Sequence, residues 1–155
     1  MNLLRCLIAV AALLPSAAHA QTTIVTGKGE MTAALPGATL KVFTYKPTGC
    51  TPTQLLLVFH GLDRDAGPYR DHAHTLANRL CAVVVAPELD AARFPTAQFQ
   101  HGGSTVALVA PLVEWARAAA GQPGMPYVLI GHSAGAQFLS RVAAYAAPQA
   151  AHIVI

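Results

Sequence analysis

Three short runs of consecutive apolar residues stand out along the chain, at residues 55–59, 82–86 and 127–130. Each run is apolar throughout rather than alternating with polar residues, which is typical of strands buried on both faces of a parallel sheet. Weaker strand patterns precede them at residues 22–28 and 39–46, where we expect an antiparallel entry to the sheet. The apolar pattern therefore predicts a sheet whose central strands are parallel.

Helical periodicity fills the intervals between these runs. The first predicted helix has Pro68 at its first helical position, and its apolar face consists of Tyr69, Ala73, Leu76, Ala77 and Leu80. A second helix is predicted over residues 104–120, where Gly121 provides a stop and Pro111 either kinks the helix or marks its start.

The last part of the chain continues the alternation. A third helix is predicted to begin at the turn around Ser133 and to end before Pro148, and residues 152–155 predict another strand. This order favours an α/β fold, with an open, mostly parallel sheet and helices on both faces. Ligands of such sheets bind beyond the carboxyl ends of the strands, and we expect the long connection at residues 88–103 to line a pocket.

Residues 1–20 have the pattern of a signal peptide. Arg5 precedes an apolar run at residues 7–14, and Ala18-His19-Ala20 fits a cleavage site. We therefore expect a secreted or periplasmic protein with one domain over residues 21–155, although an ordinary hydrophobic N-terminal helix is the alternative. No later stretch reaches the roughly 20 apolar residues of a membrane helix, so no membrane span is expected.

Charge and cysteine content narrow the picture further. The formal net charge is only +3 and the basic residues are scattered, so the composition does not favour nucleic-acid binding. After removal of residues 1–20, Cys50 and Cys81 remain, each close to the start of a predicted strand. Export makes a disulfide between them plausible, and two free buried thiols are the alternative.

The segment Gly131-His132-Ser133-Ala134-Gly135 is a G-x-S-x-G motif between a predicted strand and a predicted helix. This context is required for a nucleophile elbow, in which a sharp turn lifts a serine Oγ above the sheet. The glycines avoid collisions with the neighbouring strand, and the helix N-terminus favours negative charge. Ser133 is therefore the predicted nucleophile, with a purely structural glycine turn as the alternative.

A second motif, His60-Gly61-Leu62, directly follows the first buried strand. A backbone N–H at this position can complete an oxyanion hole together with the N–H of Ala134. Leu62 is our first choice for this donor and Gly61 the second. A plain glycine at the end of a strand is the alternative interpretation.

Together, the strand followed by HGLDRDAGPYRD and the strand followed by GHSAG and a helix resemble bacterial α/β-hydrolases, nearest to secreted esterases and polyester depolymerases. The resemblance covers residues 55–155. It implies that Ser133 attacks an acyl carbonyl, that Leu62 and Ala134 bind the oxyanion through backbone N–H groups, and that His60 supports the loop. We also expect Gly61, Gly131 and Gly135 to support the elbow and the loop, and we expect no cofactor.

The catalytic triad of this superfamily follows the order Ser, then Asp or Glu, then His. We expect both partners of Ser133, and the last strands of the fold, beyond Ile155, so the chain as written is expected to have little activity. His132 adjoins the serine and is expected to point away from it, and His60 is expected to be structural. A triad of Asp90, His101 and Ser133 is a remote alternative.

The remaining candidate residues have weaker signals. Tyr69, Phe94 and Phe99 are expected either to line an apolar substrate pocket or to serve ordinary packing. His72 and His74 are two residues apart, which is not the spacing of two metal ligands on one helical face, so no metal is predicted. A mixed-charge group is expected to form a salt-bridged surface, at Asp63, Arg64, Asp65, Arg70 and Asp71.

The sequence thus predicts an exported serine hydrolase that cleaves a small or polymeric carboxylic ester through an acyl-enzyme on Ser133. A noncatalytic truncated or binding module that keeps the hydrolase scaffold is the competing hypothesis. A third keeps the enzyme and changes the bond to a peptide or thioester. The sequence leaves the oligomeric state open.

Overall fold

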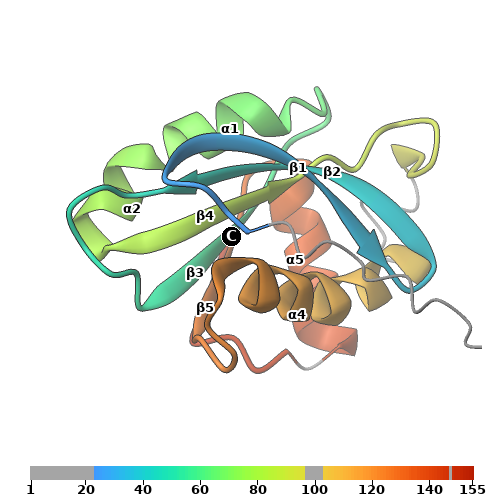
Figure 1. Ribbon diagram of the computed structural model, residues 1–155. Coiled ribbons are helices and arrows are strands. Elements are labelled where there is room, and N and C mark those ends of the chain that lie inside the picture. Colours follow the sequence, from blue (N-terminus) through green and yellow to red (C-terminus); the bar gives the residue numbers. More distant parts are fainter. Residues whose placement is uncertain (1–22, 97–102, 147) are drawn as a thin grey trace, which may run out of the picture.

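The computed structural model describes residues 23–96, 103–146 and 148–155 (Figure 1). Its sheet has six strands in the order β1-β2-β4-β3-β5-β6. Their bounds are Gly27–Leu35 (β1), Ala38–Lys46 (β2), Gln54–Phe59 (β3), Ala82–Pro87 (β4), Tyr127–Gly131 (β5) and His152–Val154 (β6). The predicted signal peptide, Phe99 and His101 lie outside the described residues.

The strands divide into an antiparallel and a parallel part. Strands β1 and β2 form a hairpin, and β2 also runs antiparallel to β4. Strands β4, β3, β5 and β6 are mutually parallel. The predicted mostly parallel sheet with an antiparallel entry is therefore confirmed.

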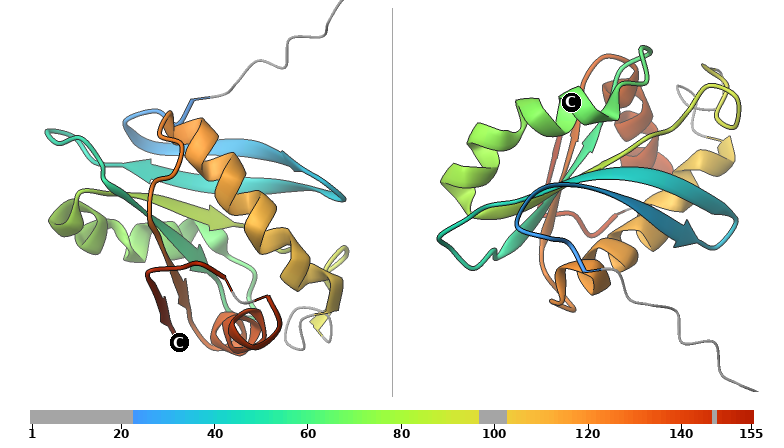
Figure 2. Two further views of the ribbon diagram at one scale, coloured as in Figure 1. Left: turned by 90° about the horizontal axis from the view of Figure 1, so that it is seen from below. Right: turned by 45° about the horizontal axis from the view of Figure 1, so that its top comes forward.

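Helices cover both faces of this sheet (Figures 1 and 2). Helices α1 (Ala66–His72) and α2 (His74–Leu80) lie on one face. The 3-10 helix η1 (Gly103–Leu108) and helices α4 (Val109–Ala120) and α5 (Ala134–Tyr145) lie on the other. This arrangement confirms the predicted α/β fold class.

Alternate residues of the central strand pack into two separate cores. In β3, Leu55, Leu57 and Phe59 belong to the core that includes residues of α4 and α5. Leu56 and Val58 belong to the core that includes residues of α1 and α2. Because both faces are covered by helices, the strand is apolar at every position, which explains its uninterrupted run in the sequence.

The first strand begins later than predicted. Residues 22–28 were the expected strand, whereas β1 starts at Gly27 and continues to Leu35. The turn between Leu35 and Ala38 sets this register, because it contains Gly37 at a φ of +84° and pairs Leu35 with Ala38. The hairpin therefore extends backwards from its turn, into a segment with weak strand propensity of its own.

The single helix predicted after β3 is also wrong in detail, because it is divided between α1 and α2 at Ala73. Pro68 is the third residue of α1 rather than the first. Ala77 is buried, but Leu76 and Leu80 are 40% and 42% exposed, so only part of the predicted apolar face contacts the core. A spacing of three and four residues does not show where a helix is interrupted.

The other two helices match their predictions more closely. Pro111 lies in the first turn of α4, which starts at Val109, so it marks the helix start and does not kink it. A proline is tolerated there because the first N–H groups of a helix have no intrahelical partner. Helix α5 follows Ser133 directly and ends at Tyr145, before Pro148.

A disulfide joins Cys50 and Cys81, whose Cα atoms are 6.2 Å apart. Cys50 precedes β3 and Cys81 precedes β4, and the first residues of these strands, Gln54 and Ala82, pair in parallel register. The N–H of Thr53 also donates to the carbonyl of Cys81 at 3.2 Å. The amino ends of the two strands are therefore linked both covalently and by a hydrogen bond.

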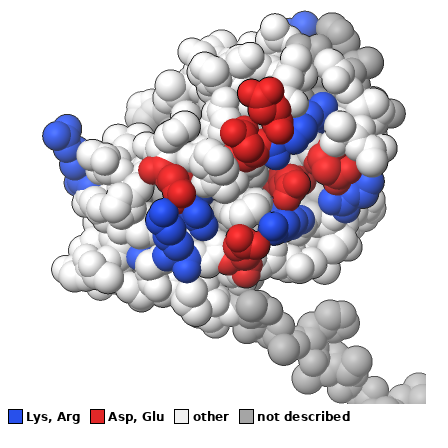
Figure 3. All heavy atoms as spheres, turned by 90° about the horizontal axis from the view of Figure 1, so that it is seen from above, with Lys and Arg blue, Asp and Glu red and all other residues white. Residues whose placement is uncertain are grey.

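Acidic and basic side chains are interleaved on the face that carries α1 (Figure 3). Asp71 contacts both Lys28 of β1, at 3.0 Å, and Arg70 of α1, at 2.8 Å. Since charges of opposite sign neutralise one another there, this face is not a basic patch. Within the part of the chain that the structure describes, no helix is long and apolar enough to cross a bilayer.

Candidate active site

The two sequence motifs lie next to each other at the carboxyl edge of the sheet. Strands β3 and β5 are parallel neighbours in which Phe59 pairs with Gly131, so His60 and His132 leave the sheet at the same level. The N–H of His132 donates to the carbonyl of Phe59 at 3.4 Å. The turn around Ser133 and the loop that begins at His60 therefore face one another.

Ser133 lies at the crest of a strained turn. Its φ of 54° and ψ of −117° are unfavourable for a residue with a side chain, and it immediately precedes α5. Ser133 is exposed, whereas Ala134 and Gly135 are buried. The backbone thus holds the hydroxyl out of the packed interior, at the N-terminus of a helix where negative charge is stabilised.

The flanking glycines are required by close backbone contacts. An ideal Cβ on Gly131 would lie 2.5 Å from the carbonyl oxygen of Gly135. An ideal Cβ on Gly135 would collide with the Phe59 carbonyl and lie 2.7 Å from the His60 carbonyl oxygen. Real Cβ atoms do not approach other atoms this closely, so any larger residue at either position would displace the turn.

Two backbone N–H groups, one in the elbow and one in the facing loop, make no backbone–backbone hydrogen bond within the described residues. Ala134 is the first residue of α5, where an N–H has no intrahelical partner. Leu62 lies in the exposed loop after β3, and its N–H is not among the backbone–backbone hydrogen bonds of the described residues. An ideal Cβ on Gly61 would lie 3.7 Å from Ser133 Cβ, which brings this loop against the elbow.

His60 is buried and is used to connect loops. Its Nε2 accepts a hydrogen bond from the N–H of Leu89 at 2.9 Å, so the proton resides on Nδ1, which donates to the carbonyl of Gly61 at 2.8 Å. Burial lowers the pKa of His60, although its hydrogen bond to Gly61 acts in the opposite direction. A neutral imidazole with both nitrogens engaged supports the loop and is unsuited to act as a general base.

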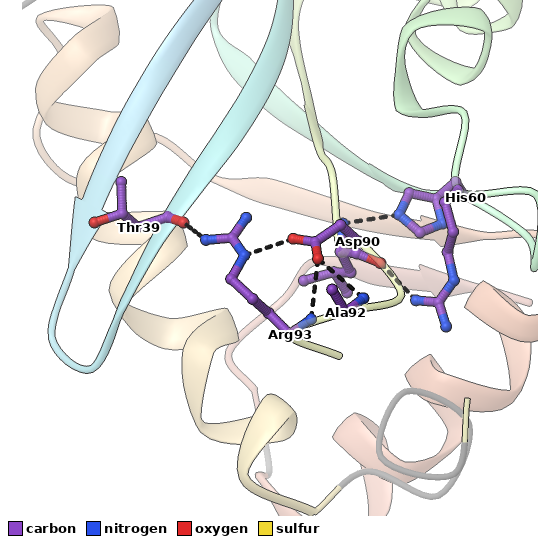
Figure 4. A network of polar contacts seen from close by, with 7 residues as sticks. Thr39, His60, Asp90, Ala92 and Arg93 are labelled. Atoms are coloured by element: carbon purple, nitrogen blue, oxygen red, sulfur yellow. Dashed lines mark hydrogen bonds and ion pairs between the residues drawn. The ribbon is translucent and has the colours of Figure 1, made fainter. Parts of the chain in front are cut away.

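The loop after β4 is fixed by the network shown in Figure 4. Asp90 accepts hydrogen bonds from the N–H groups of Ala92 and Arg93, and it pairs with the Arg93 guanidinium. The Arg93 guanidinium also donates to the carbonyl of Thr39 in β2. Backbone and side-chain hydrogen bonds from Arg93 keep the pKa of Asp90 below its ordinary value. Asp90 is therefore held within this loop by Arg93, and His101, its partner in the alternative triad, lies outside the described residues.

His132 turns its ring toward α1. Its Nδ1 lies 2.8 Å from the hydroxyl of Tyr69, and the two ring centroids are 5.9 Å apart. None of the side-chain hydrogen bonds in the described part of the chain includes the Ser133 hydroxyl. The histidine next to the serine is thus engaged with a tyrosine.

The predicted pocket aromatics are placed in different cavities. Tyr69 lines a largely apolar cavity of about 440 Å³ beside the elbow, together with Val58, Leu76, Ile130 and His132. Phe94 is 7% exposed and lies in the core, where it lines a separate cavity with Arg93 and residues of the β1–β2 turn. Among the residues that the structure describes, no group of three or more His, Cys, Asp and Glu side chains is arranged to hold a metal ion.

Three contacts around the site were not predicted from the sequence. They are the bond between Tyr69 and His132, the bond between His60 and Leu89, and a bond from the Arg64 guanidinium to the carbonyl of Leu89. The partners are 63, 29 and 25 residues apart, so no local pattern joins them. The sequence indicated only that Arg64 and Tyr69 follow His60-Gly61 closely, which places them near the loop after β3.

Comparison with known proteins identifies the architecture. No protein-family model matches the sequence, and no curated protein matches it significantly. Among solved structures, poly(aspartic acid) hydrolase-1 from Sphingomonas sp. KT-1 is 27% identical with a TM-score of 0.76, over 84% of this chain and 56% of that protein. A poly(3-hydroxybutyrate) depolymerase from Bordetella parapertussis is 28% identical with a TM-score of 0.67, over 76% and 47%.

A more distant similarity extends the comparison of the fold. The acetyl xylan esterase from Aspergillus awamori is 17% identical with a TM-score of 0.63, over 82% of this chain and 50% of that protein. The chain spans about half the length of these solved structures. The strand order and these similarities show that the chain has the fold of the α/β-hydrolases.

Proposed function

We propose that the protein is an exported serine hydrolase that cleaves carboxylic esters through an acyl-enzyme on Ser133. The observation that carries this proposal is the exposed Ser133 at a φ of 54°, directly beside the loop of Gly61 and Leu62. A strained backbone conformation costs free energy, and such conformations are concentrated at functional sites, so the strain at Ser133 favours a functional role for its hydroxyl. The solved structures with similar folds include hydrolases, which supports hydrolysis as the class of reaction.

The mechanism follows from the positions of the groups. Ser133 Oγ attacks the carbonyl carbon of the ester, and its proton passes to a general base. The carbonyl oxygen becomes an oxyanion that accepts hydrogen bonds from the N–H groups of Leu62 and Ala134. Collapse of this intermediate expels the alcohol with a proton from the same base, and water then releases the acid from the acyl-enzyme.

The base and its orienting carboxylate are proposed to come from outside the described residues. His60 is buried with both ring nitrogens bonded, and His132 is bonded to Tyr69. Asp90 is held by Arg93. In this superfamily the acid and the histidine follow the serine in sequence, so a longer form of the protein is proposed to supply them.

A neutral ester is a better substrate for this site than an anionic polymer. Asp63 and Asp65 are exposed on either side of Arg64 in the loop that follows Leu62. The guanidinium of Arg64 is directed to the carbonyl of Leu89, and its side chain is less exposed than the two acids. This loop therefore presents the carboxylates of Asp63 and Asp65 to an approaching substrate, and these carboxylates would repel a polyanion such as poly(aspartic acid).

Labelling with a fluorophosphonate tests the nucleophile, because this reagent forms a stable adduct with an activated serine. We expect the full-length protein to be labelled on Ser133, and the Ser133→Ala variant to stay unlabelled while keeping its fold. Ser140, whose hydroxyl donates to the Ala136 carbonyl in α5, provides the matched control, since Ser140→Ala should label like the wild type. A folded, full-length protein without an adduct on Ser133 would favour the noncatalytic scaffold instead.

The class of bond is tested separately. A panel of neutral ester, thioester and peptide substrates should give the highest kcat/KM with the esters, and poly(aspartic acid) should be turned over poorly. Raising the ionic strength should improve the turnover of an anionic ester, because salt screens the repulsion from Asp63 and Asp65. A clear preference for peptides or polyanions would replace the ester in this proposal.

A further inference from the structure

The hydroxyl of Tyr69 reaches the space in front of the elbow from helix α1. It lies 2.8 Å from Nδ1 of His132, the residue that precedes Ser133. An ideal Cβ on Gly61 would lie 3.1 Å from this hydroxyl and 3.7 Å from Ser133 Cβ. The tyrosine hydroxyl and the nucleophile therefore border the same small space, which stays open because residue 61 has no side chain.

We propose that Tyr69 is a further catalytic residue, whose hydroxyl donates a hydrogen bond to the substrate oxygen that becomes negatively charged when Ser133 attacks. The inference rests on the proposed function, because it requires an oxyanion at Ser133. It adds a side-chain donor to the two backbone donors, the N–H groups of Leu62 and Ala134. A donor aimed at developing charge lowers the barrier of the chemical step and leaves substrate binding nearly unchanged.

The tautomer of His132 determines whether the hydroxyl of Tyr69 can donate a hydrogen bond to the substrate. A tyrosine hydroxyl carries one hydrogen and can also accept hydrogen bonds. When Nδ1–H of His132 donates to the Tyr69 oxygen, the hydroxyl hydrogen remains available to the substrate. In this tautomer Nε2 of His132 carries no hydrogen, and because the side chain is exposed, Nε2 can accept a hydrogen bond from water. His132 is thus a positioning residue, which acts through Tyr69.

The packing around Tyr69 holds its hydroxyl in place before a substrate binds. The ring is half-buried and packs against the core beneath α1 and α2. Helix α1 itself rests closely on β2, since an ideal Cβ on Gly67 would lie 3.2 Å from the ring of Phe43. A donor on a fixed helix needs little reorganisation during the reaction, which is the condition for an effective oxyanion contact.

The test uses Tyr69→Phe in the full-length protein, which removes the hydroxyl and keeps the ring. We expect kcat for a neutral ester to fall about tenfold or more while KM stays within twofold, since one hydrogen bond to the transition state is lost. The rate of fluorophosphonate labelling should fall by a similar factor, because its phosphoryl oxygen takes the place of the oxyanion. Tyr145→Phe is the matched control, since Tyr145 is 78% exposed at the end of α5 and should behave as wild type.

Variants of His132 test the positioning role. His132→Asn keeps an N–H donor near the position of Nδ1 and should retain most of the activity, whereas His132→Leu should be as slow as Tyr69→Phe. The double variant Tyr69→Phe/His132→Leu should be no slower than either single variant, because both remove the same hydrogen bond. Unfolding temperatures of all variants, measured alongside, separate these effects from a loss of folding.

The outcomes distinguish this inference from the proposed function. If the wild type is labelled on Ser133 but Tyr69→Phe keeps its labelling rate and kcat, the tyrosine is not a donor and the proposed function stands. A rise in KM alone would assign Tyr69 to ground-state binding and would also overturn the inference. If folded wild type is not labelled at Ser133, both proposals fail together.

Discussion

The carboxyl and amino ends of the central parallel strands are held together by different means. At the carboxyl end, the elbow and the loop after β3 meet through glycine contacts, and buried His60 bonds the backbone of Leu89. At the amino end, a disulfide between Cys50 and Cys81 links β3 to β4. The carboxyl end, where the proposed site lies, thus depends on close steric fit and on a neutral histidine, whereas the amino end depends on a covalent bond. Changes of side-chain size or of pH should therefore destabilise the carboxyl end, and reduction of the disulfide should destabilise the amino end.

Adding one methyl group at the carboxyl end should have the largest effect. We expect Gly135→Ala to destabilise the protein by more than about 4 kcal/mol or to prevent folding, because the new Cβ collides with the carbonyls of β3 and its loop. Urea unfolding followed by circular dichroism measures the loss. Gly124→Ala is the control, because Gly124 has a φ of +81° with open space around it, and it should cost only about 1–2 kcal/mol. Equal losses in the two variants would mean that steric fit does not set the elbow.

Removing the disulfide should have the next largest effect. Cys50 and Cys81 are 31 residues apart, and a loop of that length predicts a loss of about 3–4 kcal/mol in the variant Cys50→Ser/Cys81→Ser. Wild type unfolded in the presence of a reducing agent should show the same loss. The folded variant should still be labelled on Ser133, since the bond lies at the far end of the strands. A folded variant that is no longer labelled would show that the two ends are coupled.

The pH dependence of stability should show a smaller effect of His60. Burial lowers its pKa in the folded state, so the unfolded state binds a proton more readily. The stabilising contribution of a neutral His60 is therefore complete above its ordinary pKa of 6.5 and is lost as the pH falls through the lower, folded-state pKa.

Urea unfolding between pH 8 and pH 4.5 measures this slope. The variant His60→Gln should be less stable than wild type by about 1–3 kcal/mol at pH 8, because the N–H of Leu89 loses a well-placed acceptor, and its stability should depend less on pH. His152→Gln alters an exposed residue of β6 and should keep the slope of the wild type. The same slope in His60→Gln as in wild type would exclude His60 as its source.

The sequence predicted the parts of the molecule that are encoded locally. The three apolar runs located β3, β4 and β5, and the G-x-S-x-G motif located a turn whose glycines are in close backbone contact. Both signals lie within a few consecutive residues, so they can be recognised without knowing which distant segment of the chain packs against them. The start of β1 was not predicted, because it depends on pairing with β2 through the turn at Gly37.

The supporting contacts of the site were beyond such analysis. His60 and Leu89 meet because β3 and β4 are neighbours in the sheet. Tyr69 and His132 meet because α1 packs on β3, which is the parallel neighbour of β5. The break between α1 and α2 at Ala73 likewise leaves no mark in the apolar spacing. Long-range packing decides each of these, and packing is fixed only when the whole sheet has formed.

The two backbone polar groups of Leu89 connect the loops on either side of the proposed site. Its N–H donates to His60 and its carbonyl accepts from Arg64, and both side chains belong to the loop that carries Leu62, the proposed oxyanion donor. The loops after β3 and β4 are therefore joined by two hydrogen bonds, so movement of one loop away from the other would have to break both.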